Sequence, residues 1–127
     1  MQEPIVPDYG GACVRGIVPA LLGPGDWSAL PAWMPAGLAE CRQVDLLVVD
    51  GLGWDQLTER AALAPVMTSM EGRPITTVAP TTTATALASI ATGLTPGEHG
   101  LVGYRMVLGG EVVNVLRWTA QGGDRSR

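Results

Sequence analysis

The sequence predicts an α/β fold with parallel strands, followed by a β-hairpin. Residues 44–50 form a nearly continuous apolar run rich in β-branched side chains, which is typical of a strand buried on both faces of a parallel sheet. Residues 44–91 alternate strand, helix, strand and helix patterns, as in parallel α/β units. Near the carboxyl end, two apolar stretches flank Gly109-Gly110-Glu111, which indicates a hairpin with a glycine-rich turn.

The first 43 residues are rich in proline and glycine, and we expect residues 1–43 to form an irregular covering segment. Within it, Arg15 to Leu22 favours a short helix that ends at Gly23-Pro24-Gly25. A second short helix is predicted to begin at Asp26.

The predicted α/β domain spans residues 44–120. After the strand at residues 44–50, Gly51-Leu52-Gly53 interrupts the apolar run, and residues 54–63 show helical spacing up to a boundary at Pro65.

A second strand is predicted from Pro74 to Val78, and Pro80 stops it. Thr81-Thr82-Thr83 then supplies hydroxyl groups at a helix start, and small residues continue the helix to Ala91. Gly93 is predicted to end that helix. The hairpin pairs residues 105–108 with 112–116, and residues 121–127 are a polar tail.

Composition argues against several classes of partner. The net charge is -4, no lysine is present and the arginines are scattered, so no basic patch for nucleic acid is expected. No apolar run reaches the roughly 18 residues of a membrane span, and the start of the chain lacks a signal peptide, so we expect a cytoplasmic protein. Cys13 and Cys41 match no metal-binding spacing and no disulfide framework.

Asp50 is the last residue of the predicted strand, directly before a glycine break. Ligands of open parallel sheets bind at the carboxyl ends of strands, where a carboxylate can hold a divalent cation. The alternative is that Asp50 caps the following helix or stabilises the turn. Its position alone favours the alternative.

Residues 80–85, Pro-Thr-Thr-Thr-Ala-Thr, place hydroxyl groups where a helix begins. A helix amino terminus suits a phosphate, and a hydroxyl there can attack phosphorus when a metal lowers its pKa. An ordinary N-cap cluster is the alternative, and three consecutive threonines exceed what capping needs. Together, Asp50 and this cluster lie at carboxyl ends of adjacent predicted strands, as a metal-activated nucleophile requires.

Three segments resemble the type I phosphodiesterase/nucleotide pyrophosphatase branch of the alkaline phosphatase superfamily. They are Val48 to Trp54, Ala79 to Ala86, and the most specific run, Ala91 to Gly100. The resemblance covers about residues 44 to 106 and implies an alkaline-phosphatase-like core, here truncated.

The resemblance also implies a mechanism and its residues. Asp50 matches a metal ligand, and Thr83 matches the catalytic nucleophile, which is also a metal ligand. The family hydrolyses small phosphoester substrates through a covalent phospho-threonine, with two zinc-like divalent metal ions as cofactors.

Two departures from the family pattern bear on activity. Ala86 stands where nucleotide pyrophosphatases place an asparagine, which affects the nucleotide substrate more than the reaction type. The chain has one histidine, His99, which belongs to a loop and is better explained as a turn-stabilising residue than as a metal ligand. Because two metals need more ligands than Asp50 and Thr83, we expect this chain alone to be an inactive fragment.

Two rival interpretations remain open at this point. One is a small nucleotide-binding module that uses Gly51-Leu52-Gly53, although Gln56 stands where a dinucleotide fingerprint needs its third glycine. The other is an inactive remnant without a site. Trp27, Trp33, Trp54 and Trp118 are scattered and fit packing better than nucleic-acid stacking.

Overall fold

The computed structural model describes residues 3–23, 30–120 and 123–124. The chain divides into two compact units. The first combines Met1–Leu22 with Thr76–Arg127, and the second is Gly23–Ile75. The helix predicted from Asp26 lies outside the described residues.

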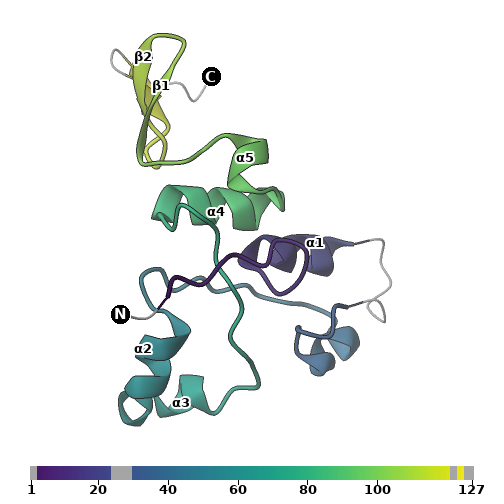
Figure 1. The fold of residues 1–127 in the computed structure, drawn as a ribbon. Coiled ribbons are helices and arrows are strands. Elements are labelled where there is room, and N and C mark those ends of the chain that lie inside the picture. The colour runs from purple at the N-terminus through teal and green to yellow at the C-terminus, as the bar shows by residue number, and fades with distance from the viewer. Residues whose placement is uncertain (1–2, 24–29, 121–122, 125–127) are drawn as a thin grey trace. The chain divides into compact units, whose positions relative to one another are not determined.

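The first unit is built around α4 (Thr83–Thr92), the longest helix of the described residues. A 3-10 turn, η1 (Val14–Gly16), and α1 (Ile17–Leu22) pack against it, and α5 (Pro96–His99) follows it (Figure 1). The most deeply buried side chains of this region are Cys13, Val78, Ala84, Thr85 and Ser89. Several of them are small, which lets backbones approach closely.

Local sequence signals define α4 at both ends, as predicted. Thr82 is the N-cap in an extended conformation, and its Oγ1 accepts a hydrogen bond from the backbone N–H of Thr85. At the other end Gly93 has a φ of 74°, and its N–H donates to the carbonyl of Ser89. A left-handed residue that closes a helix in this way is most often glycine.

The carboxyl-terminal part forms an antiparallel sheet in the order β1-β2-β3-β4 (Figure 1). Its strands are β1 (Arg105–Leu108), β2 (Glu111–Asn114), β3 (Thr119–Ala120) and β4 (Gly123–Asp124). The predicted hairpin is confirmed, with its second strand at Glu111–Asn114 and not at residues 112–116. Leu108 pairs with Glu111 across Gly109 and Gly110, whose φ angles are 60° and 83°. Two positive φ angles suit a two-residue hairpin turn, and glycine accepts them readily.

The amino-terminal residues form a parallel contact that the sequence did not reveal. Thr76 donates its N–H to the carbonyl of Ala12, at 2.8 Å, and accepts from the N–H of Val14, at 2.9 Å. The resulting Cys13–Thr76 bridge is isolated. The predicted strand from Pro74 to Val78 is therefore reduced to one bridge residue, Thr76.

The second unit contains only short helices among its described residues. They are η3 (Ala36–Glu40), α2 (Trp54–Glu59), η4 (Ala61–Leu63) and α3 (Pro65–Thr68). The single helix predicted over residues 54–63 is thus an α-helical turn and a 3-10 turn, with α3 beginning at Pro65. No side chain of residues 30–75 is buried.

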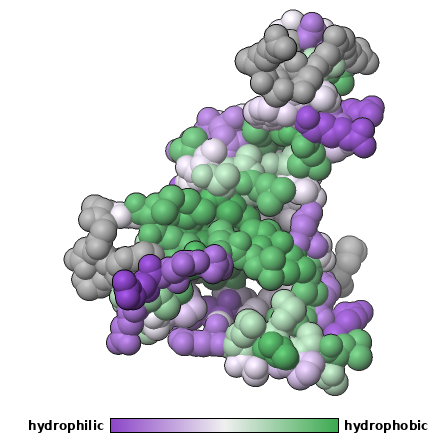
Figure 2. All heavy atoms as spheres, turned by 180° about the vertical axis from the view of Figure 1, so that it is seen from behind, coloured by the Kyte–Doolittle hydropathy of each residue, from purple (hydrophilic) through white to green (hydrophobic). Residues whose placement is uncertain are grey.

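The predicted parallel sheet and alkaline-phosphatase-like core are not confirmed. The strand expected at residues 44–50 is among the elements not confirmed, because the structure has no strand there and Leu47 is 84% exposed. A strand exists only when a neighbouring strand shares its backbone hydrogen bonds, and the described residues form no strand beside this run. Figure 2 shows apolar residues on the surface, and both units contribute large exposed apolar side chains.

Residues 1–43 fall partly in the first unit and partly in the second, and their role as an irregular covering segment stays a prediction. Within the described ranges, none of the helices has the length and apolar character needed to cross a membrane.

Candidate functional site

Thr83 is the first residue of α4, directly after the N-cap. Its side chain is half-buried, and it makes a contact within the fold. The threonine that caps the helix is Thr82, because its Oγ1 accepts a hydrogen bond from the N–H of Thr85. Thr83 therefore stands at the predicted helix start without being the N-cap.

The neighbouring threonines have structural roles. Thr81 donates its hydroxyl to the carbonyl of Val78 at 2.8 Å. The hydroxyls of Thr82 and Thr85 lie 2.9 Å apart, within hydrogen-bonding distance. Thr85 is completely buried. These contacts explain why the cluster holds more hydroxyl groups than a single cap needs.

The amino terminus of α4 favours an anion. A ten-residue helix directs the N–H groups of its first turn outward and carries a partial positive charge at this end. No acidic residue lies in the first turn to compensate that charge. The electrostatics therefore suit a phosphoryl group beside Thr83.

Asp50 lies in a turn of the second unit and is exposed. The next residue, Gly51, has a φ of 76°, so glycine is favoured there and the chain turns sharply after the carboxylate. Asp50 and Thr83 belong to different compact units, and the predicted closeness of these two side chains stays a prediction.

The described residues provide only part of the ligands that a metal site needs. A carboxylate at Asp50 and a hydroxyl at Thr83 are donor types that divalent cations accept. Across the described part of the chain, however, no three His, Cys, Asp or Glu side chains are grouped closely enough to hold a metal ion. These residues alone therefore do not fit the two ions that the resemblance implies.

The glycine loop at residues 51–53 is poorly suited to a phosphate. It leads into α2, which has only six residues. The side chain of Gln56 folds back over Gly53, so closely that a Cβ on this glycine would collide with the Gln56 Oε1. This arrangement covers the backbone that a nucleotide-binding loop presents to its ligand.

His99 and Ser89 form a hydrogen-bonded pair like a catalytic dyad, but the direction of the hydrogen bond gives the pair a structural role. The N–H of Leu101 donates to His99 Nδ1 at 3.0 Å, so the proton of the neutral ring is on Nε2. Nε2 then donates to the Ser89 Oγ, 2.9 Å away. A serine that accepts from histidine is not deprotonated by it, and Ser89 is completely buried. His99 thus has the turn-stabilising role that the sequence favoured.

The run from Thr92 to Gly100 is a compact helix-to-helix connection. Gly93 and Gly100 both adopt left-handed conformations that close α4 and α5. Glu98 reaches back to Thr95, whose N–H and hydroxyl each donate to its carboxylate at 2.7 Å. The backbone bond first, and the hydroxyl bond second, hold the pKa of Glu98 below its ordinary value. The most specific sequence motif is therefore structural, and it follows directly on the helix that begins with Thr83.

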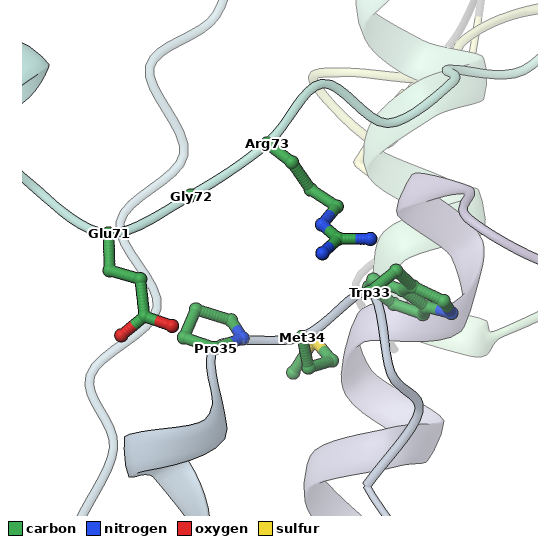
Figure 3. A pocket seen from close by; sticks show the side chains of 6 residues that line it. All are labelled: Trp33, Met34, Pro35, Glu71, Gly72 and Arg73. Atoms are coloured by element: carbon green, nitrogen blue, oxygen red, sulfur yellow. The ribbon is translucent and has the colours of Figure 1, made fainter.

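One pocket lies within the second unit and encloses about 120 Å³ (Figure 3). Trp33 and Met34 lie on one side, and Glu71, Gly72 and Arg73 come from a distant segment. Its lining includes neither Asp50 nor Thr83, so it is separate from the predicted site.

The comparison with known families agrees with the resemblance seen in the sequence. Residues 44–121 match the family model of type I phosphodiesterase/nucleotide pyrophosphatase. Neither the curated proteins nor the solved structures gave a match. The family match covers more than half of the 127 residues and includes both Asp50 and Thr83. The chain belongs to the type I phosphodiesterase/nucleotide pyrophosphatase family.

Proposed function

We propose that this chain contributes the nucleophile Thr83 and the metal ligand Asp50 to a metal-dependent phosphoester hydrolase. The observation that carries the proposal is the position of Thr83 as the first residue of α4, while Thr82 performs the capping. Membership of the family supplies the reaction class.

The chain's own groups account for substrate orientation and for the covalent step. The amino terminus of α4 attracts the phosphoryl oxygens and orients phosphorus toward the Thr83 hydroxyl. The Thr83 Oγ forms a bond to phosphorus, the bond from phosphorus to the alcohol leaving group breaks, and the hydroxyl proton is released. Water then hydrolyses the phospho-threonine, which frees phosphate or a phosphomonoester and restores the Thr83 hydroxyl.

The cofactors of this proposal are two zinc-like divalent metal ions. When bound, such ions lower the pKa of the attacking hydroxyl and offset the charge that develops on the leaving oxygen. Asp50 and Thr83 are the residues of this chain proposed to hold them. The remaining ligands would come from residues other than those described, since these contain no group of three candidate ligands.

The substrate is proposed to be a small-molecule phosphoester. The side chain of Ala86, on the first turn of α4, has no polar group with which to contact the phosphoryl oxygens or a nucleotide. The departure from asparagine therefore favours phosphodiesters in general over nucleotide pyrophosphates.

The proposal extends to the apolar run that ends at Asp50. Its large apolar residues, Leu46, Leu47, Val48 and Val49, are all exposed. Burial of such a run in a parallel sheet would remove this apolar surface from water and bring Asp50 to a sheet edge. We propose that residues 44–50 are a strand in the catalytically complete enzyme.

The test compares the 127-residue chain with the full product of its reading frame, both assayed with bis(4-nitrophenyl) phosphate and zinc. The full product should turn over, lose activity with a chelator and fall to background in Thr83→Ala. Thr82→Ala is the matched control, since it removes the neighbouring hydroxyl, which caps the helix, and keeps the hydroxyl of Thr83 itself. Turnover retained by Thr83→Ala would contradict the proposal. A reading frame that ends at Arg127 and encodes an inactive protein would also contradict it and would support the inactive-remnant interpretation.

A further inference from the structure

We propose that Tyr9 is a positioning residue for Thr83, as part of an amino-terminal clasp, Asp8–Arg15, that holds α4. The inference rests on the proposed role of Thr83 as the nucleophile. The clasp lies outside residues 44–121, which the family model matches. Its contacts are all within the first compact unit.

The hydroxyl of Tyr9 contacts both polar groups of one residue, Ala79. It accepts from the N–H of Ala79 at 3.0 Å and donates to the carbonyl of Ala79 at 3.4 Å. Ala79 precedes Thr82, the N-cap of α4, by three residues. The intervening Pro80 has a ring-restricted φ and accepts a hydrogen bond from the N–H of Thr82 at 3.0 Å. A displacement at Ala79 is therefore transmitted to the start of α4.

The clasp itself is firmly held. Asp8 donates its N–H to the Thr76 Oγ1 at 2.9 Å, and that hydroxyl donates to the carbonyl of Ala12 at 3.0 Å. The Asp8 carboxylate accepts from the N–H of Ala12 at 3.0 Å, which closes the turn around Tyr9. Tyr9 is thus anchored on both sides in sequence, so its hydroxyl is a fixed point for Ala79.

Arg15 connects the clasp to the far end of the same helix. Its Nε donates to the carbonyl of Tyr9 at 2.8 Å, and its Nη1 donates to the carbonyl of Gly93 at 2.7 Å. A cation at this end of α4 is also favoured by the helix dipole. The clasp therefore holds the chain on both sides of α4, at Ala79 before it and at Gly93 after it.

These contacts give Tyr9 an effect on chemistry without contact to a substrate. In-line attack needs the nucleophile roughly 3–3.5 Å from phosphorus, and a displacement of about 1 Å can lower a rate by roughly 100-fold. Tyr9 fixes the backbone that sets the position of the Thr83 hydroxyl. Sequence patterns did not reveal this role, because the partners are about 70 residues apart in sequence.

The experiment compares Tyr9→Phe and Tyr104→Phe in the 127-residue chain by NMR of backbone amides and threonine methyl groups. Tyr104 is a matched control because its hydroxyl also accepts one hydrogen bond, from Asn114 Nδ2 in the hairpin, at 2.8 Å. Tyr9→Phe should speed hydrogen exchange at the Ala79 amide by about fivefold to tenfold, as expected for one lost hydrogen bond, and shift the native-state resonances of Thr83. Tyr104→Phe should change neither. A general loss of stability would lower Tm without moving the native-state resonances of Thr83.

The outcomes separate this inference from the proposed function. Unchanged Thr83 resonances in Tyr9→Phe would overturn the positioning role, whatever the chemistry of Thr83. In the catalytically complete product, Tyr9→Phe should lower kcat about tenfold or more with KM changed by less than about twofold, because orientation and not substrate binding is impaired. Turnover retained by Thr83→Ala would reject the proposed function, while the NMR result on Tyr9 would still stand.

Discussion

The substitution Gly93→Ala tests the packing of the helix that carries Thr83. Gly93 has a φ of 74°, and a Cβ there would collide with the Cγ of Pro19 on α1. Gly100 has a nearly identical φ of 72° and closes α5, but a Cβ there meets nothing within 4 Å. The two glycines therefore share the conformational requirement and differ in the space around them.

The expected magnitudes follow from these geometries. A left-handed conformation costs a residue with a Cβ roughly 1–2 kcal/mol, and alanine recovers roughly 0.4–1 kcal/mol by restricting the unfolded chain. Gly100→Ala should thus lower the free energy of unfolding by about 1 kcal/mol. Gly93→Ala carries an additional overpacking term of roughly 1–3 kcal/mol, for a total of about 3 kcal/mol.

Urea unfolding followed by far-UV circular dichroism measures both effects, provided that the m-value is unchanged. Pro19→Ala removes the Cγ and relieves the collision, so a double-mutant cycle should show a coupling of roughly 1–3 kcal/mol between positions 19 and 93. Equal losses in Gly93→Ala and Gly100→Ala, or a cycle with no coupling, would refute the reasoning.

Three further predictions concern the site and its capping groups. In the catalytically complete product, Thr83→Ala should abolish turnover, whereas Thr85→Ala should retain most of the rate. Thr82→Ala should lower the free energy of unfolding by about 1 kcal/mol through the lost cap. If Thr82→Ala is inactive and Thr83→Ala is active, the nucleophile is misassigned. The 127-residue chain alone, with added zinc, should hydrolyse a nitrophenyl phosphodiester no faster than its Thr83→Ala variant, and clear turnover would mean that the missing ligands are supplied by self-association. The hydrogen bonds from Thr95 lower the folded pKa of Glu98 from 4.5. The protein should therefore be more stable than its Glu98→Gln variant above pH 4.5, and this difference should disappear as pH falls through the lower folded pKa. Urea unfolding midpoints of both proteins over this pH range would show the effect, and a difference that does not change with pH would argue against a role of the carboxylate charge.

Local features were predictable from the sequence because their causes lie within a few residues. The cap at Thr82, the left-handed Gly93 and the two-glycine turn of the hairpin each depend on the conformational preferences of their own residue types. The motif from Thr92 to Gly100 belongs to the same class, since its hydrogen bonds join near neighbours apart from those that link His99 to Ser89 and Gly93 to Arg15.

The parallel sheet could not be predicted reliably because a strand needs partners elsewhere in the chain. Residues 44–50 have the composition of a buried strand, yet residues 45–50 are exposed and the structure has no strand there. The composition of a segment predicts that it can be buried in a sheet. Whether it is buried depends on which other segments are present to pair with it and to pack on its faces.

The sequence alone determined the family, the start and end of the helix that follows Thr83, and the hairpin. Tertiary structure decided that Tyr9 binds Ala79, that Arg15 binds Gly93 and that His99 donates to a buried serine. The physical reason is separation along the chain. Capping and turn preferences act within a few residues, whereas these hydrogen bonds form only after folding brings distant donors and acceptors within about 3 Å of each other.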